Sequence, residues 1–281
     1  MNLEKKIAHM LKGQLAEKVF TEAESVSIAP HEVLRSISRE LGLDRSLVEK
    51  VAFKLGAVPE RYVRNLTTFS VEEQEKLFSS KVAVIGLGGL GGHLLESLAR
   101  AGVGSINACD GDSFEPSNMN RQLLATENSL SQKKSEAAFE LVRRVNPAVF
   151  LDVRSEFLEE DQFDDFILGA DVVADCLGGL THRKQLKEAA ARVGVPMVTA
   201  SVAGWAGIVS TVLPGYSSPM DFFGDTEGLE ELLGTPAPAI STAIGIQSAE
   251  ILKILSGKGA GLAGKALMFD LSKLYFDIVS I

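Results

Sequence analysis

The fold is decided by residues 81–122, KVAVIGLGGLGGHLLESLARAGVGSINACDGDSFEPSNMNRQ. Residues 82–85 form an apolar, β-branched run, and Gly86, Gly88 and Gly91 follow in a G-x-G-x-x-G arrangement before a helical pattern that reaches residue 101. A strand, a glycine turn and a helix in this order let the backbone approach phosphate groups, and a helix N-terminus favours their negative charge. We therefore predict nucleotide binding.

A second apolar run, residues 105–109, is followed by Asp110, about 20 residues after the glycines. A carboxylate at this position accepts hydrogen bonds from a ribose. A G-x-G-x-x-G with such an acid is most often a site for NAD or FAD, so a dehydrogenase is one interpretation of the segment.

Cationic side chains distinguish this segment from a dinucleotide site. Asn118, Arg121 and Gln122 follow the second predicted strand, and Lys134 lies a little further on. A guanidinium and an ammonium near one nucleotide suit a triphosphate that is attacked at its α-phosphorus, because negative charge builds up on the phosphoryl oxygens. The segment therefore favours ATP.

Composition restricts the class of protein. The chain has 281 residues, is 46% hydrophobic and carries a formal net charge of −9, with a pI near 5.1. This indicates a globular protein of one or two domains, and the acidic charge argues against a nucleic-acid partner. No apolar run reaches the roughly 18 residues of a membrane helix, and the polar first residues do not resemble a secretory signal. We expect a cytoplasmic protein without a membrane partner.

Cysteine and histidine residues do not suggest a metal centre. Cys109 and Cys176 end predicted strands, so we expect two buried, reduced thiols. The chain has no C-x-x-C motif, and its four histidines show no metal-ligand spacing. We therefore predict no zinc site.

Residues 1–60 are predicted to form a small helical N-terminal module without a clear strand. Two helices are expected at 33–42 and 45–56, with Gly42 and Gly56 as C-terminal caps and Asp44 as an N-cap. A helix-turn-helix is an alternative. We favour a module that packs on the main domain or on a partner, because its second helix has no dense basic face.

Residues 61–281 alternate between strand and helix patterns, and we predict that they form the ATP-binding domain. The prediction is an α/β, Rossmann-like, mostly parallel sheet with helices on both faces and an antiparallel portion near its end. Strands are expected at 82–86, 105–109, 149–153, 171–176, 196–200, 207–213 and 266–270, and helices near 71–78, 91–101, 131–144, 181–192 and 239–256. The polar connection 214–235 has the length of a lid or a disordered loop.

From residue 61 onward the chain resembles the MoeB/ThiF/HesA family, relatives of the ubiquitin-activating enzymes. The glycine turn resembles the family's GxGGLG loop, and residues 117–122 resemble its S-N-L-x-R-Q motif. Further motif positions are Arg61 and Arg64 in R-Y-x-R, Asp110, Lys134, Asn146-Pro147 and the helix 245–255.

This resemblance implies a fold, a reaction and a set of site residues. The implied reaction is ATP-dependent adenylation of the C-terminal glycine of a ubiquitin-like sulfur-carrier protein with a Gly-Gly tail, in a cytoplasmic homodimer that uses Mg²⁺. Arg64 is expected to reach the ATP of the other subunit. The implied catalytic residues are Arg64, Arg121 and Lys134, and the implied nucleotide-binding residues are Gly86, Gly88, Gly89, Gly91, Asp110, Asp112, Asn118 and Gln122. Small residues at 203, 204 and 207 leave room for an extended tail.

The chain departs from the family pattern in two places. Where the family has D-C-x-D-N-x-x-x-R, residues 175–183 read DCLGGLTHR, so Gly178 replaces the metal-holding aspartate and Gly179 its neighbouring asparagine. This leaves the metal ligands open, with Asp112 as a candidate and Asp175 expected to point into the fold. Residues 214–245 contain no cysteine, so no thioester can form on that loop.

Two other functions remain open from the sequence. The chain could adenylate a small carboxylate or a peptide, since no residue identifies the acceptor. It could also be a nucleotide-binding regulator or scaffold that has lost catalysis, which the glycine at position 178 favours.

Overall fold

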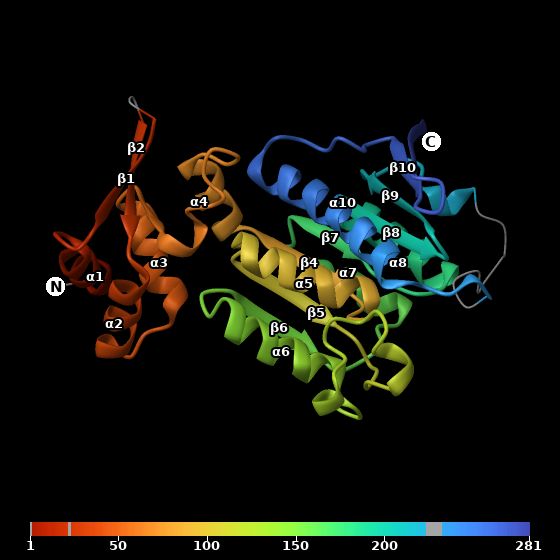
Figure 1. Cartoon of the computed structure of the whole chain (residues 1–281), viewed down its shortest axis with the longest axis horizontal. Coiled ribbons are helices and arrows are strands. Elements are labelled where there is room, and N and C mark those ends of the chain that lie inside the picture. The colour runs from red at the N-terminus through yellow and green to blue at the C-terminus, as the bar shows by residue number, and fades with distance from the viewer. Residues whose placement is uncertain (1, 22–23, 223–231) are drawn as a thin grey trace.

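A computed structural model describes residues 2–21, 24–222 and 232–281. Figure 1 shows a small N-terminal module beside a larger α/β domain. The larger domain contains an eight-stranded sheet with the order β11-β10-β9-β8-β7-β4-β5-β6. No helix in these ranges is long and apolar enough to span a membrane.

Five strands form the parallel part of this sheet. They are β4 (Lys81–Ile85), β5 (Ser105–Cys109), β6 (Phe150–Arg154), β7 (Val172–Asp175) and β8 (Met197–Ala203). In β4, Val82 and Val84 pack into one hydrophobic cluster, whereas Ala83 and Ile85 pack into another on the opposite face. Burial on both faces explains why the strand is a continuous apolar run in the sequence.

Helices cover both faces of the sheet, as predicted. One face packs against α4 (Val71–Ser79), α5 (Gly89–Ala101), α6 (Lys134–Val145) and α10 (Ala237–Ser256), and the other against α7 (Phe163–Ile167) and α8 (Leu180–Val193). The predicted Rossmann-like class is therefore confirmed.

The predicted antiparallel portion is also present. β9 (Ala206–Val212) pairs antiparallel with β8, β10 (Lys265–Asp270) with β9, and β11 (Tyr275–Ser280) with β10. The strand β11 was not predicted. It is an edge strand whose side chains are exposed on both faces, so its sequence lacks the apolar alternation of a half-buried strand.

The prediction of a purely helical N-terminal module is wrong. The module contains α1 (Leu3–Leu11), β1 (Ala16–Thr21), β2 (Glu24–Ala29), α2 (His31–Leu41), α3 (Arg45–Lys54) and β3 (Ala57–Pro59). β1 and β2 form a hairpin, and the three-residue β3 joins β2 in parallel. This pairing depends on the return of the chain after α3, so local periodicity does not reveal it.

Both predicted helices of the module occur, with slightly different ends. Gly42 ends α2 in the left-handed conformation (φ +63°), and Gly56 adopts φ +71° just after α3. Asp44 occupies the N-cap position of α3, but its side chain makes no capping hydrogen bond.

The module packs on the larger domain through α3. The ring of Phe53 lies 5.1 Å from that of Phe78 on α4 and 6.4 Å from that of Tyr62, which is fully buried. These rings form a hydrophobic cluster with Ile28, Val58, Val63 and Leu66. The segment that begins the ThiF-like motifs is thus held between the two parts of the chain.

Candidate functional site

The glycine turn between β4 and α5 requires glycine at two of its positions. Gly86 has φ +94°, and a Cβ there would lie 2.7 Å from the carbonyl oxygen of Cys176. A Cβ on Gly91 would lie 1.8 Å from the carbonyl oxygen of Gly86. The turn therefore passes directly against the loop after β7, and no larger residue fits.

Neighbouring atoms do not require glycine at positions 88 and 89. A Cβ on Gly88 would come no closer than 3.7 Å to its nearest neighbour, and one on Gly89 no closer than 3.4 Å. Gly88 is the N-cap of α5, and no side chain caps this helix. The first N–H groups of the helix thus remain available for an anion, as phosphate binding requires.

Asp110 stabilises the glycine turn by accepting a hydrogen bond from its backbone. The residue is only 8% exposed, and its carboxylate accepts hydrogen bonds from the N–H of Leu87 (2.7 Å) and the N–H of Asp112 (2.8 Å). Each oxygen has one further lone pair, so the carboxylate can also accept a hydrogen bond from a ribose hydroxyl. It therefore shapes the turn in addition to the role that the sequence suggested.

Lys134 is a buried cation beside this acid. It is the first residue of α6 and only 6% exposed. Its Nζ lies 2.9 Å from the carboxylate of Asp112 and 3.8 Å from that of Asp110. A buried ammonium is energetically costly unless it is paired with an anion. The position of Lys134 near the glycine turn therefore suits the binding of an anion.

These residues border a cavity of about 520 Å³, within the range of roughly 300–1,000 Å³ that small-molecule sites occupy. The cavity lies at the carboxyl ends of β4, β5 and β7, where the chain switches from one side of β4 to the other. Ligands of open α/β sheets bind at such switch points. Of the predicted residues, Gly86, Gly88, Asp110, Asp112 and Lys134 line it.

The loop after β6 supplies cavity residues that were not predicted, together with the loop after β7. They are Glu156, Phe157, Leu158, Glu159 and Leu177, and the helices that follow add Phe163 of α7 and His182 of α8. The exposed ring of Phe157 lies so close to Gly111 that a Cβ on the glycine would be 2.6 Å from it. For the loop after β6, the available signal was its position after a strand beside β5, because the carboxyl ends of parallel strands meet at one edge of the sheet.

Five predicted residues near the cavity do not line it: Gly89, Gly91, Asn118, Arg121 and Gln122. The Oδ1 of Asn118 accepts the N–H of Glu115, and Nη1 of Arg121 donates to the carbonyl oxygen of Ser117 (2.9 Å) and to Oδ1 of Asn120 (2.8 Å). A Cβ added to Gly89, at the start of α5, would lie 3.6 Å from Cγ of Arg121. Gln122 is buried, and its Oε1 has no hydrogen-bond partner.

Arg64 lies far from this cavity. Its neighbour Asn65 donates to the carbonyl oxygen of Ala101, at the C-terminal end of α5, whereas the glycine turn is at the N-terminal end. A helix of 13 residues is about 20 Å long. Arg64 is exposed, and its guanidinium has no ion pair within the ranges that the structure describes.

Asp175 points into the fold, as expected. It is fully buried and accepts hydrogen bonds from Oγ1 of Thr199 (2.6 Å), Nη1 of Arg183 (3.1 Å) and the N–H of Leu177 (3.1 Å). Its carboxylate is therefore committed to these internal partners and does not reach the cavity, which Gly178 borders without a side chain.

Metal ligands are sparse around the cavity. Among the described residues, no group of three or more His, Cys, Asp or Glu side chains is arranged to hold a metal ion. Mg²⁺ is usually bound by one or two carboxylates together with substrate phosphates. Asp112, with 55% of its side chain exposed at the cavity, fits that partial role.

Both cysteines are buried free thiols, as predicted. Burial raises the pKa of Cys109 to about 12 and also raises the pKa of Cys176 far above its ordinary value. Neither thiol is therefore ionised near neutral pH.

Room for a tail is not created by Gly207. A Cβ there would lie 2.3 Å from the ring of Phe269, so the absence of a side chain accommodates that ring. A Cβ on Gly204 would meet only Leu233, at 3.5 Å. The expectation that residue 207 leaves space for a peptide is therefore wrong.

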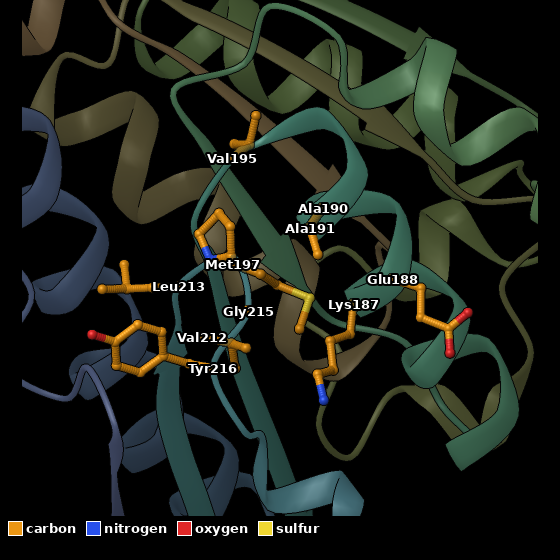
Figure 2. A pocket seen from close by; sticks show the side chains of 11 residues that line it. Lys187, Glu188, Ala190, Ala191, Val195, Met197, Val212, Leu213, Gly215 and Tyr216 are labelled. Carbon is orange, nitrogen blue, oxygen red and sulfur yellow. The ribbon is translucent and has the colours of Figure 1, made fainter.

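A second cavity lies at the opposite edge of the sheet. It measures about 170 Å³ and lies between α8, the start of β8 and the end of β9 (Figure 2). Its walls are mostly apolar and include Met197 and Val212, and the ammonium of Lys187 at its border pairs with Asp221.

The glycine turn, its acid and a buried lysine at the switch point define a nucleotide-binding α/β domain of the Rossmann type. Residues 62–281 match the ThiF family, and the chain belongs to it. The molybdopterin-synthase adenylyltransferase of Salmonella typhimurium is 31% identical over 217 residues, which are 75% of this chain and 87% of that protein. The sulfur carrier protein ThiS adenylyltransferase of Escherichia coli is 30% identical, covering 75% and 86%.

The SAMP-activating enzyme E1 of Haloferax volcanii is 29% identical, covering 78% of this chain and 84% of that protein. These relatives and the family identify the chain as an adenylyltransferase. Among solved structures, E. coli MccB with MccA-N7isoASN superposes with a TM-score of 0.69 and 17% identity, covering 90% of this chain and 80% of that one. PaaA superposes with a TM-score of 0.67 and 23% identity, covering 79% and 73%.

Proposed function

We propose that this protein uses ATP to adenylate the C-terminal glycine of a ubiquitin-like sulfur-carrier protein that ends in Gly-Gly. The observation that carries the proposal is the buried ammonium of Lys134 beside the glycine turn, in a chain of the ThiF family. The relative from Escherichia coli that is named a sulfur carrier protein ThiS adenylyltransferase supports this choice of substrate.

In the proposed reaction, a carboxylate oxygen of the terminal glycine attacks the α-phosphorus of ATP. The bond between that phosphorus and the bridging oxygen of pyrophosphate breaks, so the products are an acyl-adenylate and pyrophosphate. The N–H groups at the start of α5 bind phosphate oxygens, and the carboxylate of Asp110 accepts a hydrogen bond from a ribose hydroxyl. Lys134 exchanges Asp112 for phosphate oxygens and stabilises their charge.

Arg121 would supply a second positive charge. A Cβ added to Gly89, at the start of α5, would lie 3.6 Å from Cγ of Arg121, and among the described residues the guanidinium donates to oxygens of its own loop. A triphosphate offers stronger acceptors than the carbonyl oxygen of Ser117 and the amide of Asn120, because its oxygens carry negative charge and can bind a guanidinium in pairs.

Mg²⁺ would be held by the phosphates and by Asp112. When Lys134 turns to the nucleotide, the carboxylate of Asp112 is released at the border of the cavity. The ion would neutralise phosphate charge, and a single carboxylate with phosphate oxygens is a usual arrangement for it. Asp112 would then replace the aspartate that the family has where this chain has Gly178.

Arg64 would act only in the site of a second copy. Its own cavity lies about one α5 length away, so a cytoplasmic homodimer is the arrangement that gives this arginine a nucleotide to contact. The two copies would exchange the same residue, as two-fold symmetry requires.

The carrier's body would dock on the edge of the sheet that also carries the cavity. The β8–β9 turn and the β10–β11 turn end at this edge and are joined by a hydrogen bond from the N–H of Leu271 to the carbonyl oxygen of Trp205. Exposed apolar side chains gather there, and they are Trp205, Leu274, Tyr275 and Phe276. Exposed apolar groups in such number are typical of protein-binding surfaces.

The reaction would end at the acyl-adenylate. The connection 214–245 has no cysteine, although its residues 223–231 lie outside the described ranges, and both thiols of the chain are buried. A nucleophile from another molecule would therefore attack the adenylate.

The decisive experiment is ATP–pyrophosphate exchange with each Gly-Gly carrier protein of the same genome. Exchange that depends on one carrier would support the proposal. Binding of ATP without exchange for any carrier would instead indicate a regulator or scaffold.

A variant sharpens this experiment. Arg121→Ala is expected to reduce exchange by roughly 10²–10³-fold, as the loss of one group that stabilises phosphoryl charge does, while circular dichroism stays unchanged. Arg100→Ala is the matched control, because Arg100 pairs only with Glu96 on the exposed side of α5. An Arg121→Ala protein with wild-type exchange would refute the proposed role.

A peptide substrate is the second candidate. The ThiF match begins at residue 62, whereas the MccB structure with N-formylated MccA covers 89% of this chain, which exceeds the ThiF region and extends into the N-terminal module. Exchange stimulated by a peptide and by no carrier protein would favour this alternative.

A further inference from the structure

A buried ion pair joins the N-terminal module to the segment that carries Arg64. Glu49 on α3 is fully buried, and its Oε1 lies 3.0 Å from Nη2 of Arg61 and 3.3 Å from Nε of Arg45. Arg45 and Glu49 belong to the module, whereas Arg61 begins the ThiF-like motifs. This carboxylate is thus shared between the two parts of the chain.

Arg61 continues the connection into the nucleotide-binding domain. Its Nη1 donates to Oδ1 of Asn146, the residue that ends α6. Nδ2 of Asn146 donates in turn to the hydroxyl of Tyr62 (2.8 Å) and to the carbonyl oxygen of Ala99 in α5 (2.8 Å). One continuous network therefore runs from α3 to the C-terminal ends of α5 and α6.

Buried side chains and hydrogen bonds hold the residues on both sides of Arg64 in the sequence. Tyr62 and Val63 are buried before it, and a Cβ on Gly102 would lie 2.6 Å from the Tyr62 ring. After it, Nδ2 of Asn65 donates to Oε1 of Gln74 (2.9 Å) and to the carbonyl oxygen of Ala101 (3.2 Å). Arg64 is the exposed member of this fixed segment.

We infer that Glu49 is a positioning residue for Arg64: it holds the segment 61–65 at the angle at which Arg64 is presented to the nucleotide site of a second copy. This rests on the proposed function, since it takes from it the action of Arg64 on the partner's ATP. Burial makes Glu49 depend on the nearby guanidiniums, because removing one partner of a buried ion pair leaves an uncompensated charge in the interior. A module that moved would move Arg64 with it.

A double-mutant cycle in ATP–pyrophosphate exchange tests the inference. Arg64→Ala is expected to lower kcat at least tenfold, and Glu49→Gln is expected to lower it about tenfold. The double variant is expected to have a kcat and an ATP KM similar to those of Arg64→Ala alone. If Glu49→Gln costs the same factor with and without Arg64, the residue acts only on stability and the inference is wrong. The inference is equally wrong if Arg64→Ala exchanges like the wild type, although adenylation itself would then stand.

Two further variants guard against loss of folding. Glu49→Asp keeps the charge and is expected to restore more than half of the exchange that Glu49→Gln loses. Glu4→Gln is the matched control, because it breaks the other ion pair of α3, the surface pair between Glu4 and Lys54, and is expected to leave exchange unchanged.

Amide hydrogen exchange gives an answer that is independent of activity. Glu49→Gln is expected to speed hydrogen exchange at the amides of residues 61–66. Glu4→Gln is expected to leave their hydrogen exchange unchanged. Unchanged protection in Glu49→Gln would overturn the inference even if the protein adenylates a carrier. Faster amide hydrogen exchange in Glu49→Gln, in a protein that shows no adenylation, would uphold the link between the module and the segment. The proposed function would then fail.

Discussion

Lys134 and Asp110 bind groups of the protein in the structure, and in the proposed function each would also bind the nucleotide. Lys134 pairs with Asp112 in the structure and would pair with phosphate during the reaction. Asp110 holds the glycine turn through the N–H groups of Leu87 and Asp112 and retains lone pairs for a ribose. In the proposed function these buried residues would therefore be both structural and chemical.

Lys134→Met should reduce exchange by more than 100-fold, because the variant keeps the stem but removes the charge that stabilises the phosphoryl oxygens. Lys133→Met is the matched control, since the neighbouring ammonium is exposed and donates only to the carbonyl oxygen of Gly111. Steady-state pyrophosphate exchange would measure both. Equal losses in the two variants would contradict a specific role for Lys134.

The two thiols provide a test of burial. Because burial raises the pKa of Cys109 to about 12, and raises that of Cys176 as well, neither should react with a thiol reagent at pH 8 in the folded protein. In a denaturant both should react, giving two thiols per chain. Rapid labelling of one thiol without denaturant would show that a cysteine is available for chemistry.

At the scale of elements, helix α5 connects the two functional regions of the molecule. Its N-terminus forms the phosphate-binding turn, and its C-terminus contacts Tyr62 and Asn146. Helix α10 has a comparable linking role, because the buried amide of Gln247 donates to the carbonyl oxygens of Asp175 (3.0 Å) and Val198 (2.9 Å). It thereby bridges the neighbouring strands β7 and β8.

The close approach of α5 to β4 can be tested with glycine variants. Gly91→Ala should destabilise the protein by about 1–3 kcal/mol or more, because its Cβ would overlap the carbonyl oxygen of Gly86. Gly88→Ala should fold normally, since its Cβ meets only an ordinary contact at 3.7 Å. Urea denaturation would compare the two. Equal midpoints would show that the turn relaxes more easily than its geometry indicates.

At the scale of the whole molecule, the nucleotide cavity and Arg64 lie at opposite ends of α5. The distance makes the proposed site incomplete within one chain. It also places the N-terminal module next to the arginine that a second copy would receive, through Glu49 and Arg61.

Mixing two inactive variants should therefore restore activity. Arg64→Ala retains its own Lys134, and Lys134→Met retains the Arg64 that it lends, so a mixed dimer has one complete site. An equal mixture after subunit exchange should recover about a quarter of the wild-type rate, because half of the dimers are mixed and each has one of two sites. No recovery, with mixed dimers verified by mass spectrometry, would exclude a shared site.

Sequence by itself determined the parts of this protein that depend on local geometry. The glycine turn, Asp110 and Lys134 were predicted at the cavity, and the parallel strands were predicted within a few residues, because phosphate-binding turns and buried strands leave strict patterns in adjacent residues. Only the tertiary structure decided which distant segments meet. It paired the three-residue β3 with β2, added the loop around Phe157 to the cavity, and joined Glu49 to Arg61. These contacts join segments far apart in the chain, and periodicity within one segment does not specify them.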